Sequence, residues 1–151
     1  MDADVEVQRD PDPQRLTAEL LEGLRIFNEA VAGPYNDQPL SLSIRRHDGT
    51  LIGGLTGLFY WNMLHVHLLW VDERHRRSGC GSALLTRAEQ IAAERGCEVI
   101  YLDTYAFQAP GFYTKCGYTA VGNLKDAPKG FETTWFAKRL LGSPLSIFLA
   151  R

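Results

Sequence analysis

Apolar residues recur with two different periods along this chain, and each period predicts a kind of element. Near the N-terminus the apolar positions lie three or four residues apart, which is the spacing of one helix face. They are Leu20, Leu24, Phe27 and Val31. The helix is predicted to begin at Pro13, after an Asp12 cap, and to end at Gly33. A short strand is predicted before it, at Val5 to Val7.

From Leu40 onward the period changes to two, which predicts strands that bury one face. Asp48 and Gly49 are a two-residue hairpin signal between the first two strands. The second strand contains three glycines, which are expected to mark a bulge or a close backbone approach. These are Gly53, Gly54 and Gly57. The three strands of this predicted meander span residues 40–45, 50–60 and 63–71.

The second half of the chain predicts a helix, a strand, a short helix and two further strands. They span residues 82–95, 98–103, 110–115, 118–121 and 133–140. The strand, helix and strand between residues 63 and 103 form a crossover, which should be right-handed with parallel strands. The predicted fold class is α/β with a mixed sheet: an antiparallel meander, then a β-α-β crossover, with helices on both faces. We expect one domain over residues 1–151.

Composition narrows the classes of function. The 151 residues have a net charge of -2, so no overall positive field exists to hold nucleic acid or an anionic membrane, and neither is expected as a partner. Three cysteines without a C-x-x-C pair predict free thiols in a reducing compartment. The acidic N-terminus has no signal-peptide pattern, and no apolar run approaches the ~18 residues of a membrane span. We therefore expect a cytoplasmic protein.

The strongest chemical signal is a glycine-containing loop between a strand and a helix, at residues 71–85. Gly79 and Gly81 allow close backbone approach, and the first amides of the following helix face the loop. With its arginines, the loop favours an anion such as pyrophosphate. Three interpretations stay open: a plain turn, a dinucleotide site with Asp103 as its acidic residue, or a coenzyme A site. A P-loop is excluded, because no G-K-[ST] follows the glycines.

Two motifs make the coenzyme A interpretation specific. Arg76-x-x-Gly79-x-Gly81 is followed by Ala109-x-x-Phe112-Tyr113-x-x-x-Gly117-Tyr118. In this order and spacing the pair resembles the GNAT superfamily of N-acetyltransferases, over roughly residues 40–140. The resemblance implies the GNAT fold and acetyl-CoA as cosubstrate. It also implies an enzyme that transfers the acetyl group to a primary amine of a small molecule or peptide.

The resemblance also implies where acetyl-CoA binds. The loop amides hold the pyrophosphate, and the end of the preceding strand pairs with the pantetheine arm as an added strand would. Family members often have asparagine at the position of Ala106, for which Thr104 or Gln108 is expected to substitute. The implied cofactor-binding residues are Leu69, Trp70, Val71, Arg76, Arg77, Ser78, Gly79, Cys80, Gly81, Ser82, Thr104, Gln108, Phe112, Tyr113 and Lys115.

Three residues are predicted to be catalytic. Tyr113 occupies the position of the family tyrosine that protonates the departing thiolate. His65 and His67 alternate on one face of the strand that leads to the glycine loop. They resemble the H-x-H with which serotonin N-acetyltransferases relay the amine proton through water, and a histidine pKa near 6.5 suits that task. No third ligand stands near this pair, so no metal site is predicted.

Other functions and partners stay open at this stage. A non-catalytic acyl-CoA-binding module would hold the cofactor without turning over an amine, and an oxidoreductase would bind NAD instead. The apolar tail from Leu145 to Ala150 is expected to be buried on its own sheet or on a second subunit, which would make a homodimer. The acceptor is not identified: polyamines, arylalkylamines, aminoglycosides and protein amines are the alternatives.

Overall fold

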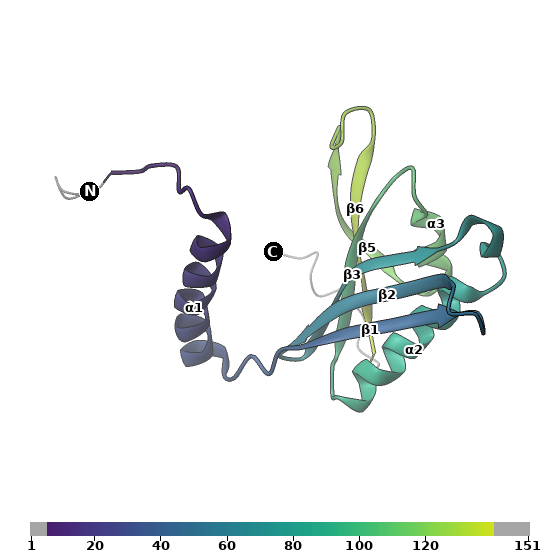
Figure 1. Ribbon diagram of the computed structural model, residues 1–151, viewed down its shortest axis with the longest axis horizontal. Coiled ribbons are helices and arrows are strands. Elements are labelled where there is room, and N and C mark those ends of the chain that lie inside the picture. The colour runs from purple at the N-terminus through teal and green to yellow at the C-terminus, as the bar shows by residue number, and fades with distance from the viewer. Residues whose placement is uncertain (1–5, 141–151) are drawn as a thin grey trace. The chain divides into compact units, whose positions relative to one another are not determined.

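Six strands form one mixed sheet in the computed structural model, which describes residues 6–140. Their order across the sheet is β1-β2-β3-β4-β6-β5 (Figure 1). The predicted antiparallel meander and the predicted parallel pairing after the crossover are both confirmed. β6 pairs antiparallel with β4 and with β5. The strands are β1 (Gln38–Arg45), β2 (Leu51–Tyr60), β3 (Met63–Val71), β4 (Val99–Tyr105), β5 (Thr119–Lys125) and β6 (Glu132–Arg139).

The predicted helices are also present. They are α1 (Pro13–Ala32), α2 (Cys80–Glu94) and α3 (Pro110–Lys115), and a short 3₁₀ helix, η1 (Glu73–His75), precedes α2. α2 begins two residues earlier than the sequence predicts, because Gly79 takes the N-cap position in the left-handed conformation (φ 86°).

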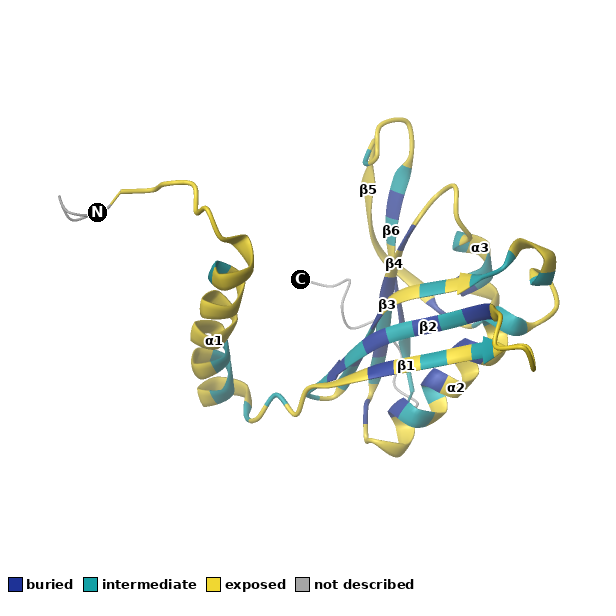
Figure 2. Ribbon diagram, in the orientation of Figure 1, coloured by how far each residue is buried: buried dark blue, intermediate teal, exposed yellow. Residues whose placement is uncertain are grey.

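The chain divides into two units, Met1–Tyr35 and Asn36–Arg151. In the first unit α1 has the predicted cap: the Asp12 side chain accepts a hydrogen bond from the Arg15 amide (3.0 Å). No residue of α1 is buried, and its apolar face is exposed (Figure 2). The assignment of one domain to the whole chain stays a prediction.

Two predictions fall at the chain ends. The prediction of a short strand at Val5 to Val7 is wrong for Glu6 and Val7, which adopt no regular structure. A segment this short forms too few ladder hydrogen bonds to offset the entropy of ordering it. Val5 and the apolar tail from Leu145 to Ala150 lie outside the described residues.

The hairpin between β1 and β2 is confirmed, but its turn differs from the predicted one. His47 and Asp48 form the centre of the turn, and the Gly49 amide donates a hydrogen bond to the Arg46 carbonyl (2.9 Å). Gly49 follows the turn at φ 87°, which a residue with a Cβ adopts at a cost. The connection is therefore longer than two residues, as in hairpins where a left-handed residue follows the turn.

One hydrophobic core joins α2 and α3 to the same face of the sheet. Lys138 on β6 shows this directly, because its ammonium donates to the Glu89 carboxylate on α2 (2.8 Å) and to the Cys116 carbonyl after α3 (3.0 Å). The predicted second helical face depends on α1 and stays a prediction. The most deeply buried core residues are Leu55, Leu64, Leu85, Ala88, Ala92, Ile100 and Leu102.

The pairing of β3 with β4 ends early, and this feature positions the site. Only Met63–His65 and Val99–Tyr101 are in register. Beyond them β3 continues beside β2 alone, and β4 continues beside β6 alone. The facing edges of the two strands therefore have no ladder partner among the described residues, at the carboxyl ends where α2 and α3 begin.

Candidate active site

A β-bulge at His67 shapes the strand that leads to the glycine loop. Thr56 lies opposite Leu68 and Gly57 opposite Val66, so His67 has no partner on β2. Gly57 makes this close approach feasible, because a Cβ there would stand 2.5 Å from the His65 carbonyl oxygen. The prediction that the glycines of this strand mark a bulge or a close backbone approach is confirmed.

The two histidines lie on the sheet face opposite α2 and α3, and their rings touch. The ring centroids of His65 and His67 are 4.6 Å apart, edge to face. On its other side His65 stacks on Tyr101, at 4.4 Å between centroids and 8° between planes. Burial lowers the pKa of His65 below its ordinary 6.5, and the charge of His67 lowers it further, while Asp103 acts in the opposite direction. The lowered pKa favours the neutral form of the His65 imidazole.

The loop before α2 has the backbone of an anion site. Asp72 caps η1 by accepting a hydrogen bond from the Arg74 amide (3.0 Å), and its carboxylate also contacts Nδ1 of His75 (3.1 Å). Gly79, in the left-handed conformation, directs the chain into α2. Its Cβ position is open space, and no side chain caps the helix. The first amides of α2 and the helix dipole therefore face outward, an arrangement that suits a phosphate.

The side chains of the loop divide into those that hold it and those that extend from it. Arg76 donates from Nε to the Val71 carbonyl (3.3 Å), and the Ser78 hydroxyl donates to the His75 carbonyl. Arg77 is exposed and has a left-handed backbone (φ 63°). These contacts fix the loop while the guanidinium charges of Arg76 and Arg77 stay at the surface.

The last residues of the loop form the first turn of α2, which lies beside the end of α3. The Cys80 thiol lies 3.2 Å from the Ser78 hydroxyl, and the Ser82 hydroxyl lies 3.9 Å from the Cys116 sulfur. Before the loop, Leu69 and Val71 pack against the core, whereas Trp70 is exposed on the other face.

Gly81 links the loop to the second motif. A Cβ on Gly81 would stand 3.1 Å from the Phe112 ring, so the glycine lets α3 pack against the start of α2. Tyr113 follows and is buried, with ring contacts to Phe112, Tyr118 and Phe136. Burial raises its pKa to about 12, and the nearby Cys116 and Asp103 raise it in the same direction. The phenol therefore keeps its proton at physiological pH.

Thr104 and Gln108, the two residues expected to replace the family asparagine, form a hydrogen bond with each other. The Thr104 hydroxyl donates to the Gln108 side-chain oxygen (2.8 Å), which also accepts from the Tyr105 amide (3.1 Å). Thr104 is buried, so the Gln108 side-chain nitrogen is the group of this pair left to face a ligand. Lys115 is exposed in the last turn of α3.

Comparison with known proteins agrees with this geometry. The model of the acetyltransferase (GNAT) family matches residues 6–118. The chain belongs to the GNAT family of acetyltransferases. It is 45% identical over 93 residues to a blasticidin-S acetyltransferase of Streptomyces morookaense, a match that covers 61% of this chain and 68% of the relative.

Two solved structures share this fold. An acetyltransferase from Bacillus cereus ATCC 14579 has a TM-score of 0.77 and 38% identity, and the match covers 87% of this chain and 97% of the other. An aminoglycoside 6'-N-acetyltransferase solved with coenzyme A shares the fold, with a TM-score of 0.63 and 21% identity over 91% of this chain and 98% of that one. This GNAT protein is an enzyme that transfers acetyl from acetyl-CoA to an amine, and neither alternative function is supported.

The residues present fit acetyl-CoA. The uncapped start of α2 and the Arg76 and Arg77 guanidinium groups suit its phosphates. The β3 edge beyond His65, which has no ladder partner on the β4 side in the described part of the chain, can accept an extended chain as an added strand. No group of three or more metal-ligating side chains is arranged for a metal within residues 6–140. None of the helices described there is long and apolar enough to cross a bilayer.

Sequence reasoning missed part of this face. It did not single out Tyr101 or Trp135, and it considered Asp103 only as a partner for a dinucleotide. The structure places Trp135 directly opposite Asp103 in the β4–β6 ladder. The period of two puts Tyr101, Asp103 and Tyr105 on one strand face, so their proximity could have been read from the sequence. The pairing with Trp135 could not, because it depends on the register of β6.

Proposed function

We propose that the enzyme acetylates a primary amine of a small molecule by direct attack in a ternary complex, with no acyl-enzyme. The bond between the amine nitrogen and the acetyl carbon forms as the bond from that carbon to sulfur breaks. The amine proton passes to His65 or His67, directly or through water, and Tyr113 returns a proton to the sulfur. The observation that carries this proposal is the position of His65, at the last paired residue before β3 and β4 separate, in contact with His67 and Tyr101.

A base is needed because the acceptor arrives charged. An aliphatic amine with a pKa of about 10.4 is neutral in only ~1 molecule in 2,500 at pH 7. The lowered pKa of His65 keeps its imidazole neutral and able to accept this proton over most of the physiological range. The contact between the rings places a second imidazole, that of His67, beside His65, and this imidazole can take over the proton through water.

The backbone of β3 is proposed to hold the thioester. Because the bulge leaves His67 without a partner on β2, and β4 is not in register beyond His65, amide groups of this stretch are available to a ligand. An N–H directed at the carbonyl oxygen stabilises the charge that develops there during attack. Leu69 to Val71 then continue along the pantetheine arm.

Tyr113 is proposed as the general acid. Its hydroxyl has no hydrogen-bond partner within the described part of the chain, and its ring is fixed by three aromatic neighbours. A pKa of about 12 makes the phenol a weak acid, so burial keeps the proton present rather than driving its release. A thiolate that forms next to the hydroxyl is itself removed from water, which raises its basicity, so it can accept first a hydrogen bond and then the proton from Tyr113.

The acceptor is proposed to be a small molecule rather than a protein terminus. The relative with 45% identity is named for acetylation of blasticidin S, a small molecule. The test is thiol release from acetyl-CoA with an amine panel that contains blasticidin S, polyamines, arylalkylamines and a peptide. Release with a small amine, together with an intact protein mass free of acetyl in its absence, is expected. Release with the peptide alone, or an acetylated protein, would overturn the proposal.

We also propose a cellular compartment and an oligomeric state for this enzyme. The thiols of Cys80, Cys97 and Cys116 are free, which supports a reducing compartment such as the cytoplasm. A homodimer is proposed as the assembly in which the apolar tail from Leu145 to Ala150 is buried on a second subunit rather than on its own sheet. Sedimentation of the full chain across a concentration series tests the dimer, and a monomer at all concentrations would contradict it.

A further inference from the structure

A strip of aromatic side chains surrounds one carboxylate on the sheet face that carries the histidines. Tyr101, Asp103 and Tyr105 alternate along β4 toward this face, and Trp135 lies opposite Asp103 on β6. We call these four residues, with Phe107 and Phe131, the aromatic strip. Its first member, Tyr101, stacks on His65, so the strip begins at the proposed site of reaction.

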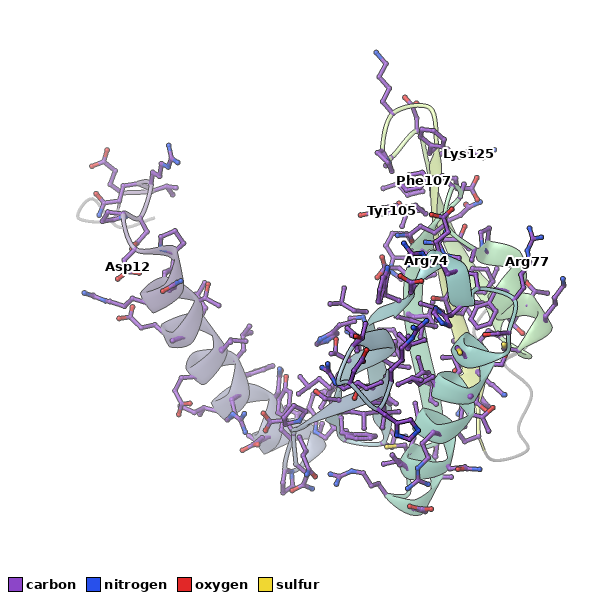
Figure 3. The ribbon with its side chains drawn as sticks, turned by 45° about the vertical axis from the view of Figure 1, so that its right-hand side comes forward. Asp12, Arg74, Arg77, Tyr105, Phe107 and Lys125 are labelled. Carbon is purple, nitrogen blue, oxygen red and sulfur yellow. The ribbon has the colours of Figure 1, made fainter. Side chains whose placement is uncertain are left out.

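The strip is exposed rather than part of the core. The rings of Tyr105 and Phe107, which lie next to each other in Figure 3, stack with centroids 5.2 Å apart and 22° between planes. Phe107 also meets Phe131 edge to face, with centroids 5.0 Å apart. Phe107 follows β4 and Phe131 belongs to the connection between β5 and β6, so together with β4 and β6 four segments contribute rings. Tyr105, Trp135, Phe131 and Phe107 are between 38% and 55% exposed. Exposed rings that gather on one face, rather than being scattered singly, are typical of a binding surface.

Asp103 is the charged member of the strip. Within residues 6–140 its side chain makes no hydrogen bond or ion pair. It lies close enough to His65 and to Tyr113 to raise the pKa of each. A carboxylate that lies among aromatic rings and has no ion-pair partner within residues 6–140 is complementary to a cation on a flat or apolar skeleton, because the ring faces also attract positive charge.

We propose that the aromatic strip binds a second positive charge of the acceptor, an ammonium or guanidinium group, through Asp103. This inference rests on the proposed function, since it takes His65 to mark the position of the reacting amine. Two residues of strand separate Tyr101 from Asp103, a distance of ~6.6 Å. The acceptor class is therefore an amine that carries its second cation a few bonds away, with its carbon skeleton against Tyr105 and Trp135.

The test compares two amines of nearly equal size on the CoA-saturated protein. 1,4-Diaminobutane carries two charges with a similar spacing, and pentylamine replaces the second ammonium by a methyl group. We expect calorimetry at low salt to show at least tenfold tighter binding of the diamine, the range of a charge-assisted hydrogen bond. In Asp103→Asn the ratio of the two dissociation constants, pentylamine over diamine, should fall toward one. Asp103→Ser repeats the test should the asparagine variant fold poorly.

Glu94→Gln is the matched control, because it removes the same charge from an exposed carboxylate at the far end of α2. It should keep the preference for the diamine. Equal binding of the two amines by the parent protein would overturn the proposal. So would a ratio that Asp103→Asn leaves unchanged, or one that Glu94→Gln lowers equally. Failure of the proposed function is read separately, as absence of thiol release while the diamine still binds selectively.

Discussion

His65 and Tyr101 stack face to face across the last register pair of β3 and β4, with ring centroids 4.4 Å apart. The contact covers one face of an imidazole whose pKa is lowered mainly by burial. Tyr101 is itself partly buried, which raises the pKa of its phenol, so it stays neutral beside the histidine. One ring thus sets the environment of the proposed base without taking a proton.

The pH profile should report this contact. If neutral His65 is the base, kcat/KM falls as the pH drops through its pKa, and because that pKa is lowered the acidic limb should lie below pH 6.5. Tyr101→Leu exposes the imidazole, so its pKa should rise and the limb should move to higher pH. Tyr101→Phe keeps the ring and should keep the limb in place. A limb that stays fixed in the leucine variant, or moves in both, would exclude burial by Tyr101 as the cause.

Substitutions of His65 and His67 should have different effects on kcat and on the acidic limb of the pH profile. His65→Ala is expected to lower kcat by about 10²-fold or more, within the range for loss of a general base, and to abolish the acidic limb. His67→Ala removes a charge that lowers the pKa of His65, so it should move the limb to higher pH. Steady-state rates across pH 5 to 9 measure both effects. An unchanged profile in both variants would place the base elsewhere.

Tyr113→Phe should affect turnover rather than binding. The hydroxyl has no partner to lose within the described chain, and the ring contacts are kept, so stability and acetyl-CoA affinity should change little. kcat should fall about 10²-fold or more. Because the pKa of Tyr113 is about 12, the parent enzyme should show no basic limb from this group below pH 10. Full activity in the phenylalanine variant would remove Tyr113 as the acid.

Alanine substitutions of the two glycines that flank α2 should distinguish an effect on stability from an effect on acetyl-CoA binding. Gly79 and Gly96 both have left-handed backbones (φ 86° and 79°), and at both a Cβ would enter open space. Alanine at either should destabilise the protein by roughly 1–2 kcal/mol, the cost of that conformation. Only Gly79→Ala should also weaken acetyl-CoA binding, measured by calorimetry. Equal affinities in the two variants would contradict the assignment of the loop to the phosphates.

The bulge can be tested through Gly57. Alanine there would bring its Cβ to 2.5 Å from the His65 carbonyl, and backbone cannot move away cheaply. We expect a loss of about 1–3 kcal/mol in the free energy of unfolding and a lower kcat, since the bulge would shift. Gly122→Ala on β5, where a Cβ meets nothing within 4 Å, is the control and should change neither quantity much. The readouts are chemical denaturation and thiol release.

The sequence by itself determined the order of the helices and strands from Pro13 onward and the position of the glycine loop. Those signals are local: a helix cap at Asp12, glycines at the helix ends, and periods of two or 3.6 that depend only on backbone geometry. It also placed the two histidines on one strand face, for the same reason.

Only the tertiary structure decided how these parts meet. The length of register between β3 and β4, the bulge at His67 and the pairing of Asp103 with Trp135 depend on which strands become neighbours. Hydrogen bonds between strands join residues that are distant in the chain, and no local period encodes their register. The turn at Gly49 differs from the predicted one because the same two residues suit more than one hairpin geometry, and the strands on either side select it.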